Sequence, residues 1–428
     1  MSIKRRRHGF LCWMTCTTVA MALLVYLRLT HTVITQLDPI DPSSIMTIDG
    51  ASPSVMATFP PNQPSKPLRL QVPFYVYQNA TLNWQHFTFS QPGPNYEEFK
   101  HSDDLWLYRA SMKHPMRTDD PTKAKLFFVP FFLNAVSERR TCLALPGRNE
   151  TRCFDRPRHA YRFADQQLAL SPFFQRSQGQ DHVLVISHWL APPRKIPNLL
   201  RCNIINFEGR IPQPSSPNVS SLASFYVGRP CPPLNPTWTK THDLVMIATF
   251  KPQMPEFAVR QNICQWLSDY NNRTSTSAPT TGSRGTTDNT YSIAHCGPGH
   301  QCPALAQAKY GFHPRGDTWG SNRVMDLFLS RTIPLFTDPQ QYQVLPPFVP
   351  WRNLSYLIHV STPEAFDASL QSIVSPHRSN NNHNHHNDDG DGNDDDYSTK
   401  RRLIEEYMHL FDHTQIYQFD AYMAEFAK

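Results

Sequence analysis

Glycine is scarce in this chain of 428 residues, since 16 glycines stand against 39 prolines. That imbalance favours rigid loops over flexible linkers. Two glycine-rich phosphate loops are absent, the Walker loop that ends in lysine and the Gly-x-Gly-x-x-Gly turn of dinucleotide-binding proteins. Their absence argues against nucleoside triphosphates and dinucleotides as ligands. Asp-x-Asp pairs occur in one acidic segment only, which lacks the apolar residues that fix metal ligands.

The length and composition favour a two-domain protein, because 428 residues are about twice a typical domain and 39% of them are hydrophobic. The formal charge of +6 is unevenly spread. Residues 4–7 contribute +4, six aspartates between Asp388 and Asp396 contribute −6, and the remainder is near +8. A mildly basic folded part suits anionic ligands.

The N-terminus predicts a membrane anchor. Basic residues 4–7 precede eighteen uncharged residues at 10–27, a length at the lower end of what spans a bilayer. The charge asymmetry favours a cytosolic tail at 1–9, an anchor at 10–29 and a luminal remainder. A cleaved signal peptide is the alternative, but no clear small-x-small site follows the apolar run. Residues 30–70, rich in Pro, Ser and Thr, are typical of a disordered stem.

Glycosylation and cysteine patterns agree with a luminal body. Asn-x-Ser/Thr sequons stand at Asn79, Asn149, Asn218, Asn272 and Asn353. Seven of the nine cysteines follow the anchor, so at least one stays free or pairs between chains. The simplest local disulfide candidates are Cys142 with Cys153 and Cys296 with Cys302. A metal site in the His- and Cys-containing run 295–302 is the weaker alternative, because its spacing fits no zinc pattern.

Two series of strands and helices follow the stem, and they predict two α/β domains with parallel sheets. In the first series, residues 119–133 are expected to form a short capped helix and then a buried strand, and residues 181–187 are a further short apolar run. The proline-rich stretch 212–236 is expected to be an interdomain connection. The predicted boundaries are an N-terminal Rossmann-like domain at 71–236, a C-terminal domain at 240–376, a low-complexity acidic loop at 377–398 and a C-terminal helix or helix pair at 399–428.

The segment from Tyr310 to Phe336 carries the sharpest local signal. A strand ends near Phe312, the loop "HPRGDTWGS" follows, and Ser321 is a natural cap for the next helix. In a doubly wound sheet, ligands bind at such strand ends, and a helix N-terminus suits phosphate. Arg315 and Arg323 would then hold a diphosphate, although an ordinary turn followed by a helical ion pair would also explain the spacing.

These residues resemble the exostosin-like glycosyltransferases, glycosyltransferase family 47. The resemblance spans about 70–375 and rests on five fragments in the family's order: "DPTKAKLFFVPFF", "RSQGQDHVLVISH", "HPRGDTWGSNRVMD", "RTIPLFTD" and "LPPFVPW". The chain departs from the family pattern at His313, where a leucine is usual before the Pro-Arg-Gly, and at Trp189, where an acid often stands.

The resemblance implies a GT-B fold, in which two Rossmann-like domains face a cleft, behind an N-terminal transmembrane anchor and stem. It implies inverting transfer from a nucleotide sugar, UDP-linked, to a glycan or glycoprotein acceptor by a type II Golgi membrane protein whose catalytic part is luminal. The fold requires no metal or other cofactor. Expected partners are the nucleotide sugar, the acceptor and the membrane; a homo- or heterodimer stays open, and no nucleic acid is expected.

Site roles follow from this resemblance together with the local pattern. Diphosphate binding is assigned to Arg315, Ser321 and Arg323 beside Gly316, and donor hydroxyl contacts to Asp317 and Asp326. Arg260 is expected either to add a phosphate contact or to be an ordinary surface arginine of its helix. The candidates for the base are Asp181, His182 and His188, for which a strand cap and a buried polar histidine are the structural alternatives. Two alternatives stay open, a catalytically inactive sugar-binding partner and a Golgi sulfotransferase, whose phosphosulfate signature the sequence lacks.

Overall fold

The computed structural model describes residues 68–77, 88–89, 96–137, 142–144, 151–153, 157–188, 196–209, 219–229, 231, 239–276, 291–299, 302–374 and 396–428. Ser65–Lys428 form one compact unit. Within the described residues, no helix combines the length and the apolar character needed to cross a membrane. The predicted anchor, almost all of the predicted stem and the acidic loop lie outside these residues, as do the sequons at Asn79, Asn149 and Asn218.

The first parallel sheet is built from short, buried apolar strands. Among the described residues its strands follow the order β3-β1-β4-β7-β8-β9, and every neighbouring pair is parallel. Strands buried on both faces read as continuous apolar runs, as in the Leu-Phe-Phe-Val of β4. The strand bounds are β1 Phe74–Val76, β3 Arg117–Thr118, β4 Leu126–Val129, β7 His182–Ile186, β8 Asn203–Asn206 and β9 Ser221–Ala223. The helices of this part are α2 Asp103–Lys113, α3 Leu133–Ser137, α4 Pro157–Ala169 and α5 Pro172–Ser177.

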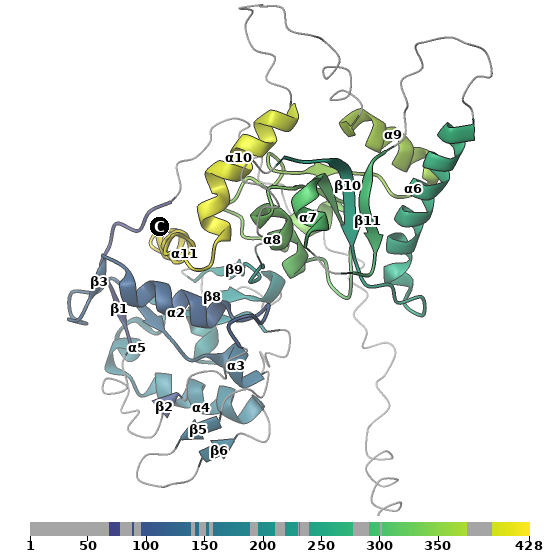
Figure 1. Cartoon of the computed structure of the whole chain (residues 1–428). Coiled ribbons are helices and arrows are strands. Elements are labelled where there is room, and N and C mark those ends of the chain that lie inside the picture. The colour runs from purple at the N-terminus through teal and green to yellow at the C-terminus, as the bar shows by residue number, and fades with distance from the viewer. Residues whose placement is uncertain are drawn as a thin grey trace, which may run out of the picture. The chain divides into compact units, whose positions relative to one another are not determined.

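The second parallel sheet has the order β11-β10-β12-β13-β14 in the described part of the chain. Its strands are β10 His242–Ile247, β11 Ile293–Gly297, β12 Ala308–His313, β13 Ile333–Phe336 and β14 Tyr356–Leu357. Its helices are α6 Ala258–Thr276, α7 Ala304–Gln307, α8 Asn322–Leu329 and α9 Pro363–Val374. In Figure 1 the two sheets are separate, the first with α2 to α5 and the second with α6 to α9. The α/β class with parallel sheets, predicted from the alternation of strands and helices, is confirmed.

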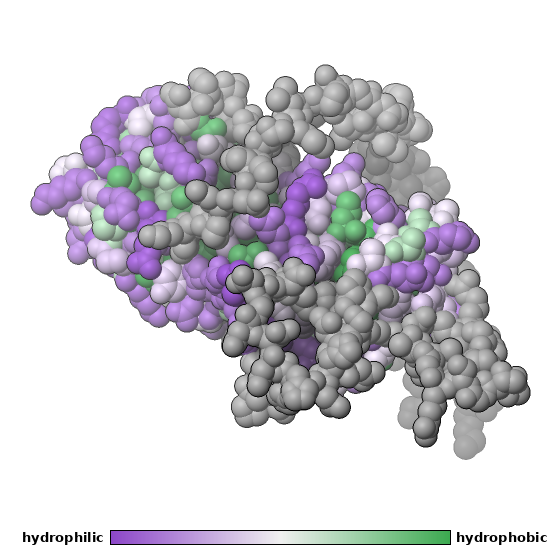
Figure 2. Space-filling model, turned by 90° about the horizontal axis from the view of Figure 1, so that it is seen from above, coloured by the Kyte–Doolittle hydropathy of each residue, from purple (hydrophilic) through white to green (hydrophobic). Residues whose placement is uncertain are grey.

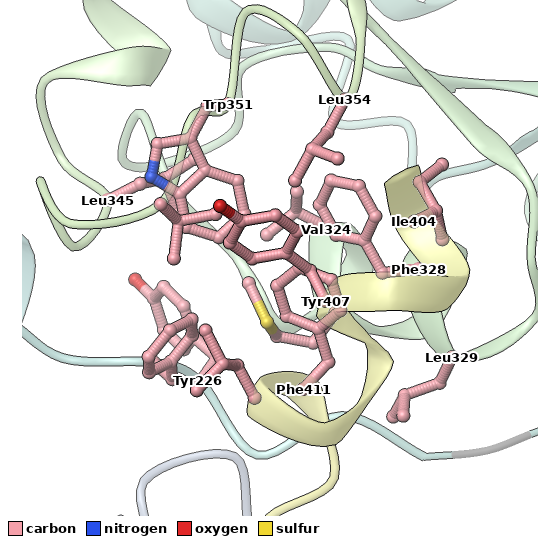
Figure 3. Packing of buried hydrophobic residues seen from close by; sticks show 14 of the residues in the cluster. Tyr226, Val324, Phe328, Leu329, Leu345, Trp351, Leu354, Ile404, Tyr407 and Phe411 are labelled. Carbon is pink, nitrogen blue, oxygen red and sulfur yellow. The ribbon is translucent and has the colours of Figure 1, made fainter. Parts of the chain in front are cut away.

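The C-terminal segment, predicted as a helix or a helix pair, forms the two helices α10 Asp396–Phe411 and α11 Tyr417–Phe426. Helix α10 begins at Asp396, within the segment predicted as the end of the acidic loop. Helix α10 packs on α8, where Phe411 stacks on Phe328 with ring centroids 4.5 Å apart. Figure 3 shows this contact within the apolar cluster around Val324 and Trp351. Helix α11 returns to the first sheet, since the Tyr422 hydroxyl donates to the Ala223 carbonyl over 2.8 Å. The end of the chain thus packs on elements of both sheets.

Two other details differ from the sequence-based expectation. Residues 119–125 form turns rather than a helix, because the Asp120 carboxylate accepts from the Thr122 amide over 3.0 Å and competes with helical hydrogen bonding. The proline-rich stretch 212–236 contains β9 and so is more than a connection.

The disulfides of the second half link distant elements. Cys231 is bonded to Cys302 and Cys264 to Cys296, so the predicted bridge between Cys296 and Cys302 is wrong. Among the described side chains, Cys202 is a free and buried thiol, which fits the odd cysteine count.

A small antiparallel sheet has the order β2-β5-β6, with bounds β2 Thr88–Phe89, β5 Cys142–Ala144 and β6 Thr151–Cys153. Its register places Cys142 opposite Cys153. The side chains of both cysteines lie outside the described part, and their predicted bridge stays a prediction.

Candidate active site

The loop between β12 and α8 lies at the carboxyl edge of the second sheet. Helix α8 begins at Asn322, and the Ser321 hydroxyl accepts a hydrogen bond from the Arg323 amide over 3.2 Å, as predicted for a cap. A hydrogen bond fixes the start of the loop, because the Gln341 side-chain amide donates to the His313 carbonyl over 2.7 Å. The first turn of α8 therefore starts from a fixed point, with its amide groups and positive dipole end at the strand edge.

Arg260, from α6, holds the loop closely. Its Nε donates to the Arg315 carbonyl over 2.9 Å, and its Nη1 donates to the Thr249 carbonyl over 2.8 Å. A Cβ added at Gly316 would lie 2.4 Å from Nη2 of Arg260. A side chain at position 316 would therefore have to displace the Arg260 guanidinium. Arg260 thus lies where a phosphate contact was predicted, and its printed bonds also give it a structural role.

Arg315 is oriented by an aromatic ring. Its guanidinium lies 4.0 Å from the centroid of Trp319, a cation–π contact within the same loop. The Nε atom of Arg315 is buried and makes no hydrogen bond within the described residues. The stacking holds the guanidinium plane without using its hydrogen-bonding edge.

Arg323 and Asp326 form the ion pair that helical spacing suggested. The Arg323 Nη1 atom lies 3.5 Å from Oδ2 of Asp326. Asp326 is fully buried and accepts from the Arg229 amide over 2.7 Å. The predicted contact of Asp326 with donor hydroxyls therefore has no support in its position, because this carboxylate lies behind Arg323 rather than on the surface of the site.

Asp317 is exposed, with 63% of its side chain accessible, and accepts from Lys251 Nζ over 2.9 Å. A carboxylate in this position is open to a sugar hydroxyl, in keeping with its predicted role. Lys251 adds a further cation to the rim of the loop, and the sequence analysis did not identify it.

His313, the residue that departs from the family pattern, is buried at the end of β12. Its pKa is lowered to about 3, first by burial and then by the nearby cations Arg260 and Arg323, while a hydrogen bond with the Trp319 backbone acts in the opposite direction. His313 is therefore neutral at physiological pH. It contributes shape to the loop and no charge, so the positive charge at this edge comes from the arginines and Lys251. Burial likewise lowers the pKa of Arg260 and of Arg323.

The carboxyl edge of the first sheet meets this loop. Glu208, just after β8, accepts from the Gly320 amide over 2.9 Å and from the Tyr226 hydroxyl over 2.6 Å. The Tyr226 ring packs on His101 with centroids 5.5 Å apart, and His101 packs on His188 at 5.3 Å. These contacts connect His188 to the Gly320 backbone. Glu208 was not predicted as a site residue, because no local pattern around it in the sequence indicates this contact.

The three candidate bases do not gather at one place. Asp181 and His182 precede or begin β7, and they bond to each other over 2.6 Å. His182 is buried and its Nε2 bonds to the Tyr77 hydroxyl over 2.7 Å. His188 follows the other end of β7, roughly 20 Å away at 3.3 Å per residue. Asp181 and His182 thus lie at the amino edge of the sheet, where the parallel-sheet rule places no ligand. That position argues against both as bases and leaves His188 at the carboxyl edge.

A buried polar cluster lies next to His188. The Asp103 carboxyl accepts from the Ser187 hydroxyl over 2.5 Å and from the Asn134 amide over 3.1 Å. Burial raises the pKa of Asp103 to about 8, and the neighbouring Asp104 raises it as well. This carboxyl is therefore largely protonated at neutral pH. Among the described residues, no group of three or more His, Cys, Asp or Glu side chains is placed to hold a metal ion.

The chain belongs to the exostosin family, because the model of the exostosin GT47 domain matches residues 74–373, well over half of its length. This match confirms the resemblance drawn from the five sequence fragments. Membership of this family supports a glycosyltransferase, and the matched range contains both parallel sheets and the β12–α8 loop. No curated protein sequence matches the chain.

Several solved glycosyltransferase structures are similar to the chain at low identity. A Staphylococcus aureus TarM variant in complex with fondaparinux, α-GlcNAc-glycerol and UDP is 8% identical, with a TM-score of 0.30; the match covers 62% of this chain and 58% of that one. The spinosyn forosaminyltransferase SpnP is 11% identical, with a TM-score of 0.30, over 79% of this chain and 95% of that one. The chain spans 59% of TarM in another crystal structure. TM-scores this low carry no argument about the activity.

Proposed function

We propose that the chain is an inverting glycosyltransferase that moves a sugar from a UDP-linked donor to a glycan or glycoprotein acceptor. The observation that carries the proposal is the cationic loop at the start of α8. Arg315 and Arg323 flank a capped helix N-terminus, and Arg260 stands behind them. Cations and amide groups so placed bind a diphosphate and stabilise its charge as it leaves.

In this proposal the second sheet binds the donor and the first sheet binds the acceptor, as in the GT-B arrangement. The acceptor oxygen attacks the anomeric carbon, the bond from that carbon to the diphosphate breaks, and the acceptor proton passes to a base. Of the three predicted bases, His188 stands at the carboxyl edge that faces the donor loop. Asp317 has an exposed carboxylate for a donor hydroxyl.

The proposed setting is the Golgi membrane, with the catalytic part in the lumen and a single N-terminal anchor. Support comes from the apolar run at 10–27, the five sequons and the described disulfides. The sequons at Asn272 and Asn353 lie on exposed residues. Glycosidase treatment of the expressed protein tests this placement: a mobility shift that N272Q and N353Q reduce supports it, and no shift contradicts it.

The enzymatic test follows nucleoside diphosphate release. The full chain is incubated with a panel of UDP- and GDP-sugars and candidate glycan acceptors, and the anomeric configuration of any product is read by NMR. The R315A/R323A double variant is expected to lose release by at least about 100-fold, since two charge-assisted contacts are removed. R402A, on the exposed face of α10, is the matched arginine control. Absence of release with every donor, or full activity in the double variant, contradicts the proposal.

A further inference from the structure

Glu208 adopts an unusual backbone conformation at the carboxyl edge of the first sheet. Its φ of 51° and ψ of 28° lie in the left-handed region, which is unfavourable for a residue with a Cβ. The residue is nevertheless buried, with 5% of its surface exposed. Such a conformation persists when surrounding contacts hold it, and it marks positions with a defined role.

One oxygen of Glu208 makes both of the contacts described above. Its Oε1 accepts from the Gly320 amide, and the same atom accepts from the Tyr226 hydroxyl. Gly320 immediately precedes the cap residue Ser321, so this hydrogen bond fixes the peptide that leads into α8. A carboxylate on the first sheet therefore sets the backbone of the predicted diphosphate loop on the second.

The fit around this contact is close. A Cβ added at Gly320 would lie 2.9 Å from Oε1 of Glu208 and 3.0 Å from the Tyr226 ring. Tyr226 is itself buried, and its ring packs against Phe207 with centroids 6.0 Å apart. Figure 3 shows Tyr226 in the same apolar cluster as Val324 and Phe328 of α8. Glu208, Tyr226 and Phe207 thus leave no room for the loop to shift toward the first sheet.

We propose that Glu208, supported by Tyr226, is a positioning residue that holds the Gly320–Arg323 backbone in the conformation that binds a nucleoside diphosphate. The identity of the ligand rests on the proposed function, whereas the contact itself does not. Losing the acceptor leaves the Gly320 amide without a buried partner, so the peptide turns toward water and the cap at Ser321 loosens. The α8 amide groups and Arg323 then no longer converge on one anion.

The test compares substitutions that differ in one hydrogen-bond acceptor, measured on the full chain by calorimetric titration with UDP and, separately, GDP. E208A is expected to weaken nucleotide binding roughly 10- to 100-fold, the effect of one unsatisfied buried donor. E208Q is expected to stay within about threefold of wild type, because one amide oxygen can accept both bonds that Oε1 accepts now. E406A, on exposed α10, is the matched glutamate control.

G320A disturbs the same contact but leaves Glu208 unchanged. It is expected to weaken nucleotide binding as E208A does. Hydrogen exchange of a peptide covering residues 314–323, measured without nucleotide, reports the loop directly. Faster exchange is expected in E208A and G320A, and wild-type exchange in E208Q and E406A. This readout separates the positioning role from the ligand identity.

The outcomes are distinguishable. Wild-type affinity and wild-type exchange in E208A overturn the positioning role. Loss of binding in E208Q equal to that in E208A also overturns it, because the charge and not the hydrogen bond would then matter. If the wild-type chain binds neither UDP nor GDP, the proposed function fails, while faster exchange in E208A still supports the positioning of the loop.

Discussion

Replacement of Asp326 offers a sharp test of the site geometry. Its fully buried carboxylate accepts from the Arg229 amide at 2.7 Å, from the Asn322 side chain at 3.3 Å and from Arg323 at 3.5 Å. Removing one partner of a buried ion pair costs about 3–5 kcal/mol. Arg323 keeps a quarter of its side chain exposed, so solvent screens part of the loss. We therefore expect D326A to lower the free energy of unfolding by about 3 kcal/mol.

The assay is urea unfolding followed by circular dichroism, combined with UDP titration below the transition. D119A is the control, because Asp119 forms an exposed surface pair and its loss should cost under about 0.5 kcal/mol. UDP affinity of D326A should fall roughly tenfold as Arg323 loses its support. Unchanged stability together with a selective loss of affinity for the sugar part of the donor would refute this reasoning and restore Asp326 as a sugar ligand.

Four further predictions follow from the same contacts. R315K keeps the charge but loses the planar fork stacked on Trp319, so UDP affinity should fall about tenfold by titration calorimetry, and an unchanged affinity would count against the assignment. Because folding raises the pKa of the Asp103 carboxyl, its protonated form favours the folded state at low pH, and this contribution to stability is lost as the pH rises through about 8. The urea midpoint of the wild-type chain should therefore decline between about pH 4 and 8, and D103N should flatten that decline. Because folding lowers the pKa of His313, its neutral form favours the folded state above its ordinary pKa, and this contribution to stability is lost as the pH falls toward about 3. H313Q should therefore reduce the fall in melting temperature at acid pH, measured by thermal melts. The C264A/C296A variant opens a disulfide that spans 32 residues and should lose about 3–4 kcal/mol in urea unfolding, whereas a midpoint equal to wild type would exclude the bridge.

Local sequence patterns were sufficient to predict strands and helices whose position depends mainly on their own residues. The apolar run at 182–186 is a buried parallel strand, and Ser321 caps α8 as its side chain and position indicated. The apolar face of α6 is buried through Ile263 and Leu267. In each case the driving force is the burial of side chains at a regular period, which the sequence displays directly.

Disulfide and hydrogen-bond partners that lie far apart in the sequence could not be predicted from local patterns. The predicted Cys296–Cys302 bridge assumed that neighbours in sequence pair, but Cys302 lies near Cys231, 71 residues earlier. The contact of Glu208 with Gly320 joins residues 112 apart, and nothing local at Glu208 indicates it. Only the packing of both sheets into one unit brings these groups together.

The direction of a predicted strand also says which candidate bases can reach a ligand. Asp181 precedes β7 and His182 begins it, so both belong to the amino edge of a parallel sheet. Ser187 and His188 stand after it, at the edge where ligands bind. The direction of the strand separates these residues without any knowledge of the structure.

The central claim, that the start of α8 binds the diphosphate of a nucleotide sugar, is tested most directly by titrating the full chain with UDP and with uridine. UDP should bind at least about tenfold more tightly than uridine in the wild-type chain, because the arginines and α8 amide groups contact only the diphosphate. In the R315A/R323A variant this preference for UDP should fall strongly, because only the α8 amide groups and Arg260 are left to hold the diphosphate. Equal affinities for UDP and uridine in the wild-type chain, or an unchanged preference for UDP in the double variant, would contradict diphosphate binding at the start of α8.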